Sequence, residues 1–201
     1  MVRKIVLLVF TLVVMASALT AWSVSVKNQI EARELAEPVF SEYVDKAGQI
    51  SLPAKYRTSF VHLGSYAVAT KPGVPVNELH NVYTRPEDVV AFQREGNFPD
   101  GAILVKEVYR TAAGTLSTGE VKWASDIKLW FVMVKDQKGR FENSVQWGDG
   151  WGWALFHATA PKINAVTDYT ANCRACHIPA RKDDWIYLRG YPFLKTERPT
   201  K

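Results

Sequence analysis

Both cysteines of the chain lie near its end, in the run Cys173-Arg174-Ala175-Cys176-His177. Two thiols spaced in this way on a helical turn reach the two vinyl groups on one edge of a haem, and Cys-x-x-Cys-His is the attachment signature of c-type haem. The adjacent histidine is then held beneath the iron as an axial ligand. We therefore predict one covalent haem c, attached through Cys173 and Cys176, with His177 as the metal ligand.

Two other interpretations of the motif stay open at this stage. Half of a zinc site would use the same residues but would need two further ligands nearby. A redox-active dithiol would use both cysteines but would not need the histidine. The beginning of the chain favours haem, because c-type haem is attached outside the cytoplasm.

The N-terminal segment has the pattern of an export signal. Arg3 and Lys4 precede an uncharged, largely apolar run from Ile5 to Val26, and Ala16-Ser17-Ala18 fits a small-residue cleavage site. We predict that residues 1–27 form a helical signal peptide or a membrane anchor, with the rest of the chain in the periplasm, either soluble after cleavage or anchored to the inner membrane. The net charge is +5, but the basic residues are scattered, so nucleic-acid binding is not expected.

A second axial ligand is harder to find. The candidates are the remaining histidines and the methionines: His62, His80, His157, Met1, Met15 and Met133. Two of the methionines lie in the leader, the third lies in an apolar strand, and a lone histidine in a strand is usually structural. The sequence therefore predicts an open haem face that binds or converts a small molecule.

The remaining patterns indicate a sheet with helices near its ends. Strands are predicted at 57–70, 80–84, 102–110, 129–134 and 147–156, the last with a turn at Asp149-Gly150. Thr84-Arg85-Pro86-Glu87 matches a capping box for a helix that should stop at Gly96, and a second helix is predicted over 167–187. This order is typical of an α+β domain with an antiparallel sheet and flanking helices, and it places the haem motif on a C-terminal helix. We expect a linker helix at 28–37 and the haem domain at 38–197.

Four runs carry a resemblance to a known family: Asp45–Arg57, Val82–Val108, Val134–Phe141, and the C-terminal run with Cys-Arg-Ala-Cys-His followed by Asp-Asp-Trp-Ile-Tyr-Leu-Arg-Gly-Tyr-Pro. They resemble the cytochrome P-460 family, which contains hydroxylamine-oxidising monohaem cytochromes and the nitric-oxide-binding cytochromes c′-beta. The resemblance covers about 38–194. It implies an antiparallel sheet with flanking helices, a homodimer, and haem on the two cysteines and the histidine.

The resemblance also implies roles for three further residues. Lys106 matches a lysine that hydroxylamine-oxidising members bond to the haem ring; as a strand residue it alternates with Leu104 and Val108, so the alternative is an edge-strand lysine with its amine in water. Asp168 is the candidate for a distal carboxylate that takes protons from hydroxylamine; the alternative is ordinary helix capping. Arg189 is the candidate partner of a haem propionate, or a solvated arginine.

The first functional hypothesis is a haem oxidoreductase that oxidises hydroxylamine, binding it opposite His177 and passing electrons to a redox partner cytochrome. The second is a protein of the cytochrome c′-beta type that binds nitric oxide without catalysis. A simple electron carrier is the third and is disfavoured by the missing methionine ligand. The sequence does not determine whether Lys106 is bonded to the haem, which substrate or electron acceptor is used, or whether the leader is cleaved.

Overall fold

The computed structural model describes Trp22, Ser25, Lys27 and residues 40–195. The predicted leader and the linker helix at 28–37 therefore lie outside the described residues, apart from those three helical positions. Among the helices of the described part, none combines the length and the apolar character needed to cross a bilayer.

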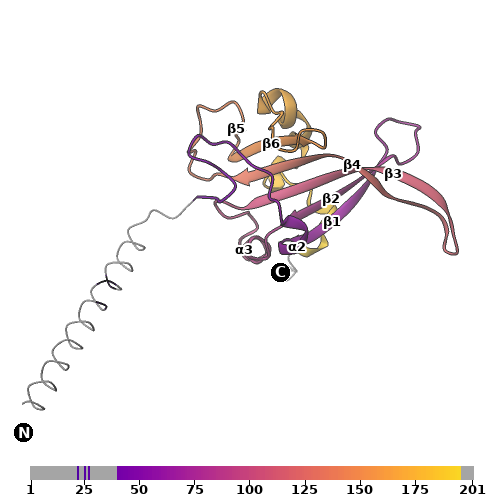
Figure 1. Ribbon diagram of the computed structural model, residues 1–201, viewed down its shortest axis with the longest axis horizontal. Coiled ribbons are helices and arrows are strands. Elements are labelled where there is room, and N and C mark those ends of the chain that lie inside the picture. Colours follow the sequence, from indigo (N-terminus) through magenta and orange to yellow (C-terminus); the bar gives the residue numbers. More distant parts are fainter. Residues whose placement is uncertain (1–21, 23–24, 26, 28–39, 196–201) are drawn as a thin grey trace, which may run out of the picture. The chain divides into compact units, whose positions relative to one another are not determined.

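A six-stranded antiparallel sheet forms the centre of this part, as predicted (Figure 1). Its strands are β1 Val61–Val68, β2 Glu78–Thr84, β3 Ile103–Leu116, β4 Gly119–Lys135, β5 Trp147–Gly148 and β6 Trp151–His157. Their spatial order is β1-β2-β3-β4-β6-β5. Every pairing is antiparallel, and the pairing of β1 with β2 is irregular between His62 and Gly64. The α+β class is confirmed.

Strands β3 and β4 are longer than the predicted strands. Their ends form a hairpin that projects beyond the other strands (Figure 1). Outside the core these residues are exposed or half-buried, and their sequence lacks the apolar run that marks the central part. The turn at Asp149-Gly150 between β5 and β6 is confirmed, with φ values of 56° and 78° at these two positions.

Two short helices precede the central strands, α2 at Tyr56–Ser59 and α3 at Pro86–Glu95. Helix α3 ends at Gly96 as predicted, because this glycine adopts φ 76° and its N–H closes the last turn. The predicted capping box is wrong. Thr84 is still in β2, where its hydroxyl donates to the Ile103 carbonyl at 2.6 Å, and Arg85 is the N-cap.

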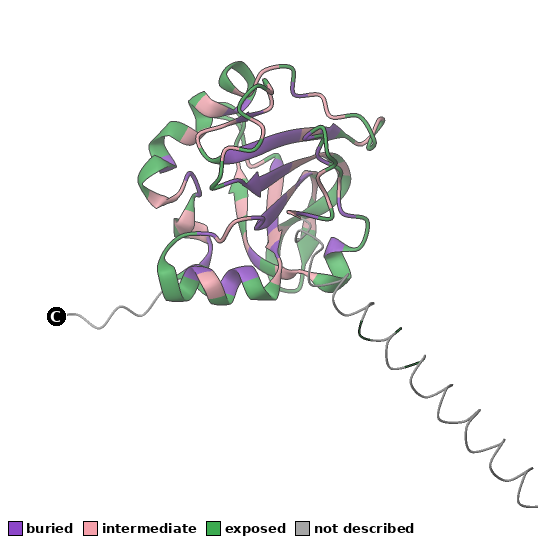
Figure 2. Cartoon of the chain, turned by 90° about the vertical axis from the view of Figure 1, so that its left-hand side faces the viewer, coloured by how far each residue is buried: buried purple, intermediate pink, exposed green. Residues whose placement is uncertain are grey.

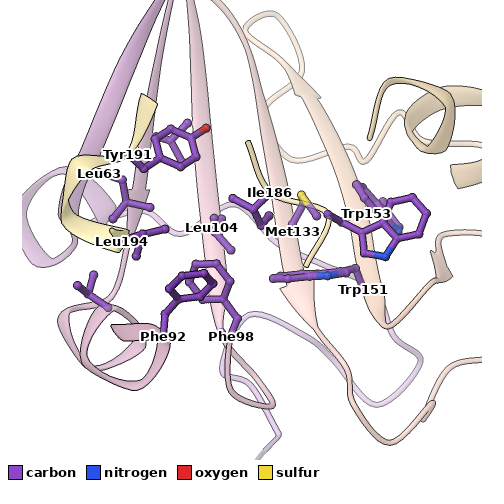
Figure 3. Close-up of a cluster of buried hydrophobic side chains, with 14 of the residues drawn as sticks. Leu63, Phe92, Phe98, Leu104, Met133, Trp151, Trp153, Ile186, Tyr191 and Leu194 are labelled. Atoms are coloured by element: carbon purple, nitrogen blue, oxygen red, sulfur yellow. The ribbon is translucent and has the colours of Figure 1, made fainter. Parts of the chain in front are cut away.

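The sheet is covered on both faces. Side chains such as Val105 and Val132 pack against the segment around Phe40–Phe60, whereas Leu104 and Met133 face α3 and the C-terminal segment. Figure 2 shows that buried residues are concentrated in the strands and exposed ones in the surrounding helices and loops. In Figure 3, Ile186 lies close to Leu104 and Met133, whereas Tyr191 and Leu194 lie beside Leu63.

The predicted helix over 167–187 is confirmed only in part, because the helical stretch covers 170–183 and is not a regular α-helix. It consists of a π-helix η1 at Thr170–Arg174, α4 at Ala175–His177 and a 3-10 helix η2 at Ile178–Asp183, and two 3-10 turns follow, η3 Leu188–Gly190 and η4 Pro192–Leu194. Pro179 has no N–H for a helical hydrogen bond, and Asp184 and Trp185 adopt positive φ values of 56° and 67°. The haem motif therefore spans a π-helix and one α-helical turn.

Candidate haem site

A cavity of about 430 Å³ lies between the sheet and the C-terminal segment. It is lined by Cys173, Cys176, His177 and Lys106, so the structure brings four of the six predicted site residues to one place. The strands β2, β3 and β4 supply a largely apolar wall: Val82, Leu104, Val108, Leu129, Phe131 and Met133. The volume is in the range of cofactor pockets.

The two cysteines are not equivalent. Cys173 is only 7% exposed, whereas Cys176 is exposed, and both thiols are free. Burial raises the pKa of Cys173 to about 11, which keeps this thiol protonated at neutral pH. The turn between them is held to the sheet by Arg174, whose Nε donates to Asp149 at 2.7 Å.

His177 is oriented by a backbone carbonyl. Its Nδ1 lies 2.8 Å from the Trp185 oxygen, and because a carbonyl only accepts, Nδ1 carries the hydrogen and Nε2 is left as the free acceptor. The indole of Trp153 packs against the His177 imidazole in a T-shaped arrangement, with 4.9 Å between the ring centroids. Burial lowers the pKa of His177, which favours the neutral form that binds metals.

The residue before Trp185 forms a buried ion pair. Asp184 accepts from Lys135 Nζ at 2.5 Å and from the Phe98 N–H at 3.1 Å. The side chains of Lys135 and Asp184 are only 11% and 8% exposed. These contacts fix the two consecutive left-handed residues that turn the chain toward His177.

Lys106 on β3 is paired with Phe131 on the neighbouring strand β4, and its Nζ is 4.2 Å from the centre of the Phe131 ring. Burial lowers the pKa of Lys106, although the thiols of Cys176 and Cys173 oppose this effect. A lysine whose charged form is disfavoured is a better nucleophile. The alternative of an amine held in water at a sheet edge is wrong, because β3 is an internal strand and the side chain lines the cavity.

Asp168 and Arg189 do not line the cavity. The Asp168 carboxylate accepts from the N–H and the hydroxyl of Thr170 at 2.8 and 2.6 Å, which is a capping arrangement. Arg189 is exposed on η3. The structure thus separates both residues from the four that it brings together.

Three polar residues that sequence reasoning did not assign as a group also line the cavity. Glu78 accepts from Lys128 Nζ at 2.5 Å and lies 2.9 Å from His80 Nε2. Of the candidates for a second axial ligand, His80 and Met133 line the cavity, whereas His62 and His157 do not. The available signal was the spacing of Glu78, His80 and Val82, which places all three on one face of a strand.

The donor set fits a c-type haem: two thiols three residues apart, an imidazole with a free Nε2, and apolar walls around them. Fold and site together define a c-type haem cytochrome built on an antiparallel sheet. The sequence model of the family Cytochrome P460 matches residues 53–188, and the chain belongs to this family. A comparison with curated proteins found no match.

Proposed function

We propose that the chain binds one haem c, covalently attached through Cys173 and Cys176, and uses its open face to oxidise hydroxylamine. One observation carries this proposal: the amine of Lys106 lines the same cavity as the attachment motif. A lysine bonded to the haem ring is the feature that the family resemblance links to hydroxylamine oxidation. Support for this link comes from the position of the amine over the Phe131 ring and from the burial that lowers the pKa of Lys106.

When bound, the haem supplies an iron that takes up electrons from a nitrogen ligand and passes them on. His177 would hold the iron through Nε2, and the Trp185 carbonyl would keep the imidazole in the required tautomer. The apolar wall would limit the contact of the reacting molecule with water. The geometry does not favour Asp168 as a proton acceptor, because its carboxylate accepts hydrogen bonds from Thr170.

Nitric oxide binding without catalysis is the second candidate. It is favoured by Phe131, an aromatic ring that lines the cavity opposite Lys106 and suits an uncharged diatomic ligand. In this case Lys106 would remain an unmodified amine over the ring. The state of Lys106 therefore separates the two candidates.

We also propose a location and partners for the haem domain. It lies in the periplasm, either cleaved from its leader or anchored by it. It forms a homodimer and delivers electrons to a partner cytochrome. These proposals rest on the N-terminal charge pattern and on the family resemblance. Secretion of a fusion that carries residues 1–27 would test the export signal.

The decisive experiment compares the haem-loaded protein with Lys106→Leu. If Lys106 is bonded to haem, proteolysis yields a branched species that joins the Lys106 peptide, the haem and the Cys173–Cys176 peptide. Lys106→Leu then keeps thioether-bound haem, changes the ferrous absorption spectrum and loses hydroxylamine oxidation. Lys122→Leu, the same change at an exposed position of β4, is the control and should alter none of these. An unmodified Lys106 without hydroxylamine turnover would favour nitric oxide binding.

A further inference from the structure

A charged network borders the cavity on strands β2 and β4. Glu78 is 8% exposed and accepts from Lys128 Nζ at 2.5 Å, and its other oxygen lies 2.9 Å from His80 Nε2. Glu78 and His80 are two residues apart on β2, so both point to the cavity face. The Lys128 side chain is 42% exposed, and the network therefore connects the cavity with solvent.

The hydrogen bonds determine which nitrogen of His80 is free. An ionised carboxylate only accepts, so the hydrogen between Glu78 and His80 belongs to Nε2. Within the described part of the chain, no group donates to or accepts from Nδ1 of His80. The neutral ring consequently offers Nδ1 as a proton acceptor, with Glu78 positioned to stabilise the imidazolium that forms.

The charges around the pair favour this protonation pattern. Burial alone would raise the pKa of Glu78, but hydrogen bonds from Lys128 and His80 outweigh it and lower the pKa. Burial lowers the pKa of His80, Glu78 opposes this, and Lys128 adds to it, as does Lys106 while its amine is unmodified and charged. Two residues of the neighbouring strands lie opposite this pair, Arg110 opposite Glu78 and Tyr66 opposite His80. They contribute little to the two pKa values, because Arg110 is exposed and the Tyr66 hydroxyl is hydrogen bonded to the backbone. At neutral pH, Glu78 is ionised and His80 is neutral.

We propose that His80 is the proton acceptor of this cavity and that Glu78 positions it. The inference deepens the proposed function and rests on it for its substrate. Oxidation of NH₂OH to HNO releases two electrons and two protons; the electrons go through the haem to a one-electron acceptor protein. His80 Nδ1 receives the protons one at a time, and each returns to solvent along the exposed side of the network before the next.

The test uses a ligand that must lose a proton but is not oxidised. Hydrogen cyanide binds ferric haem as cyanide and releases one proton, whereas carbon monoxide binds ferrous haem without proton transfer. In the haem-loaded protein, His80→Gln and Glu78→Gln should each slow cyanide association at neutral pH by about 10-fold or more, since general acid–base catalysis contributes about 10²–10⁴-fold. Carbon monoxide association should change less than about 2-fold.

Two further variants distinguish a positioning role of Glu78 from a purely structural one. Glu78→Asp keeps a carboxylate and should recover part of the cyanide rate, whereas Glu87→Gln, an exposed carboxylate on α3, should leave both rates unchanged. If Glu78→Gln does not load haem, His80→Gln decides the question alone. In the wild type, cyanide association should rise as His80 loses its proton, and His80→Gln should remove this step from the pH profile.

Three results would overturn the inference. Unchanged cyanide association in His80→Gln would exclude His80 as a base, and equal slowing of cyanide and carbon monoxide would indicate structural damage only. Faster cyanide binding in His80→Gln would mean that His80 occupies the sixth position of the iron. Because cyanide binding needs no turnover, absence of hydroxylamine oxidation in the wild type would refute the proposed function while leaving this test valid.

Discussion

The buried ion pair between Lys135 and Asp184 is expected to be among the most sensitive points of the fold. Replacing Asp184 with Asn removes one charge and keeps the shape. Asn also tolerates the positive φ of 56° and can still accept the Phe98 N–H. The substitution therefore isolates the effect of leaving the Lys135 ammonium without its partner, at a side-chain exposure of 11%.

The expected loss of stability follows from burial. Removing one partner of a buried pair costs about 3–5 kcal/mol, because the remaining charge stays desolvated. With a urea m-value of about 2 kcal/mol per M, this lowers the unfolding midpoint by about 1.5–2.5 M. Urea titration of the haem-loaded protein, followed by tryptophan fluorescence, measures this shift. The Soret spectrum at low urea reports whether His177 keeps its position.

Two controls define the result. Glu95→Gln breaks an exposed pair with Arg94, whose side chains are 53% and 72% exposed, and should cost less than about 1 kcal/mol. Adding Lys135→Met to Asp184→Asn removes both charges and should recover part of the lost stability. A cost below about 1 kcal/mol for Asp184→Asn would show that the ion pair does not hold the segment before His177.

Further outcomes can be checked in parallel. Cys173→Ala with Cys176→Ala should remove the thioether attachment, so that no haem survives denaturation on a haem-stained gel; covalent haem that remained would point to another linkage, such as the one at Lys106, or contradict the attachment motif. Gly64→Ala should destabilise the fold by about 1–3 kcal/mol, since its Cβ would lie 1.9 Å from a backbone oxygen of η3. The pKa of Glu78 is lowered from 4.5, so its contribution to the free energy of unfolding is present above that pH and is lost as the pH falls through the folded-state pKa. Glu78→Gln should flatten this part of a plot of stability against pH in the acid range. Asp168→Asn should leave the pH profile of hydroxylamine oxidation unchanged if Asp168 only caps its turn; a shifted profile would restore it as a proton acceptor.

The sheet and the attachment motif could be predicted because their signals are local. The run Leu129–Val134 is apolar over successive positions, and Cys-x-x-Cys-His requires only the right spacing. The placement of Lys106 in the cavity was predicted in part, since strand alternation indicates its apolar neighbours but not which face the C-terminal segment covers.

The missed features depend on contacts between distant parts of the chain. Lys135 and Asp184 are 49 residues apart, and Glu78 and Lys128 are 50 apart, so no spacing rule connects them. Asp168 resembles a site residue because it precedes the first cysteine, yet the turn that follows it directs its carboxylate to Thr170. The C-terminal helix was overestimated because the strain at Asp184 and Trp185 is imposed by tertiary contacts.

The unequal exposure of the two cysteines has a consequence for the order of maturation. Cys173 is almost completely buried once the C-terminal segment is packed on the sheet. The hydroxyl of Tyr66 on β1 holds this segment in place, because it is hydrogen bonded to the Tyr187 carbonyl and the Gly190 N–H. A haem ligase that must reach both thiols therefore needs the segment from residue 170 onward to be undocked. Because the whole sheet precedes this segment in the chain, we expect the haem to be joined to a partly folded apoprotein. Docking of the final residues would then lock it in place.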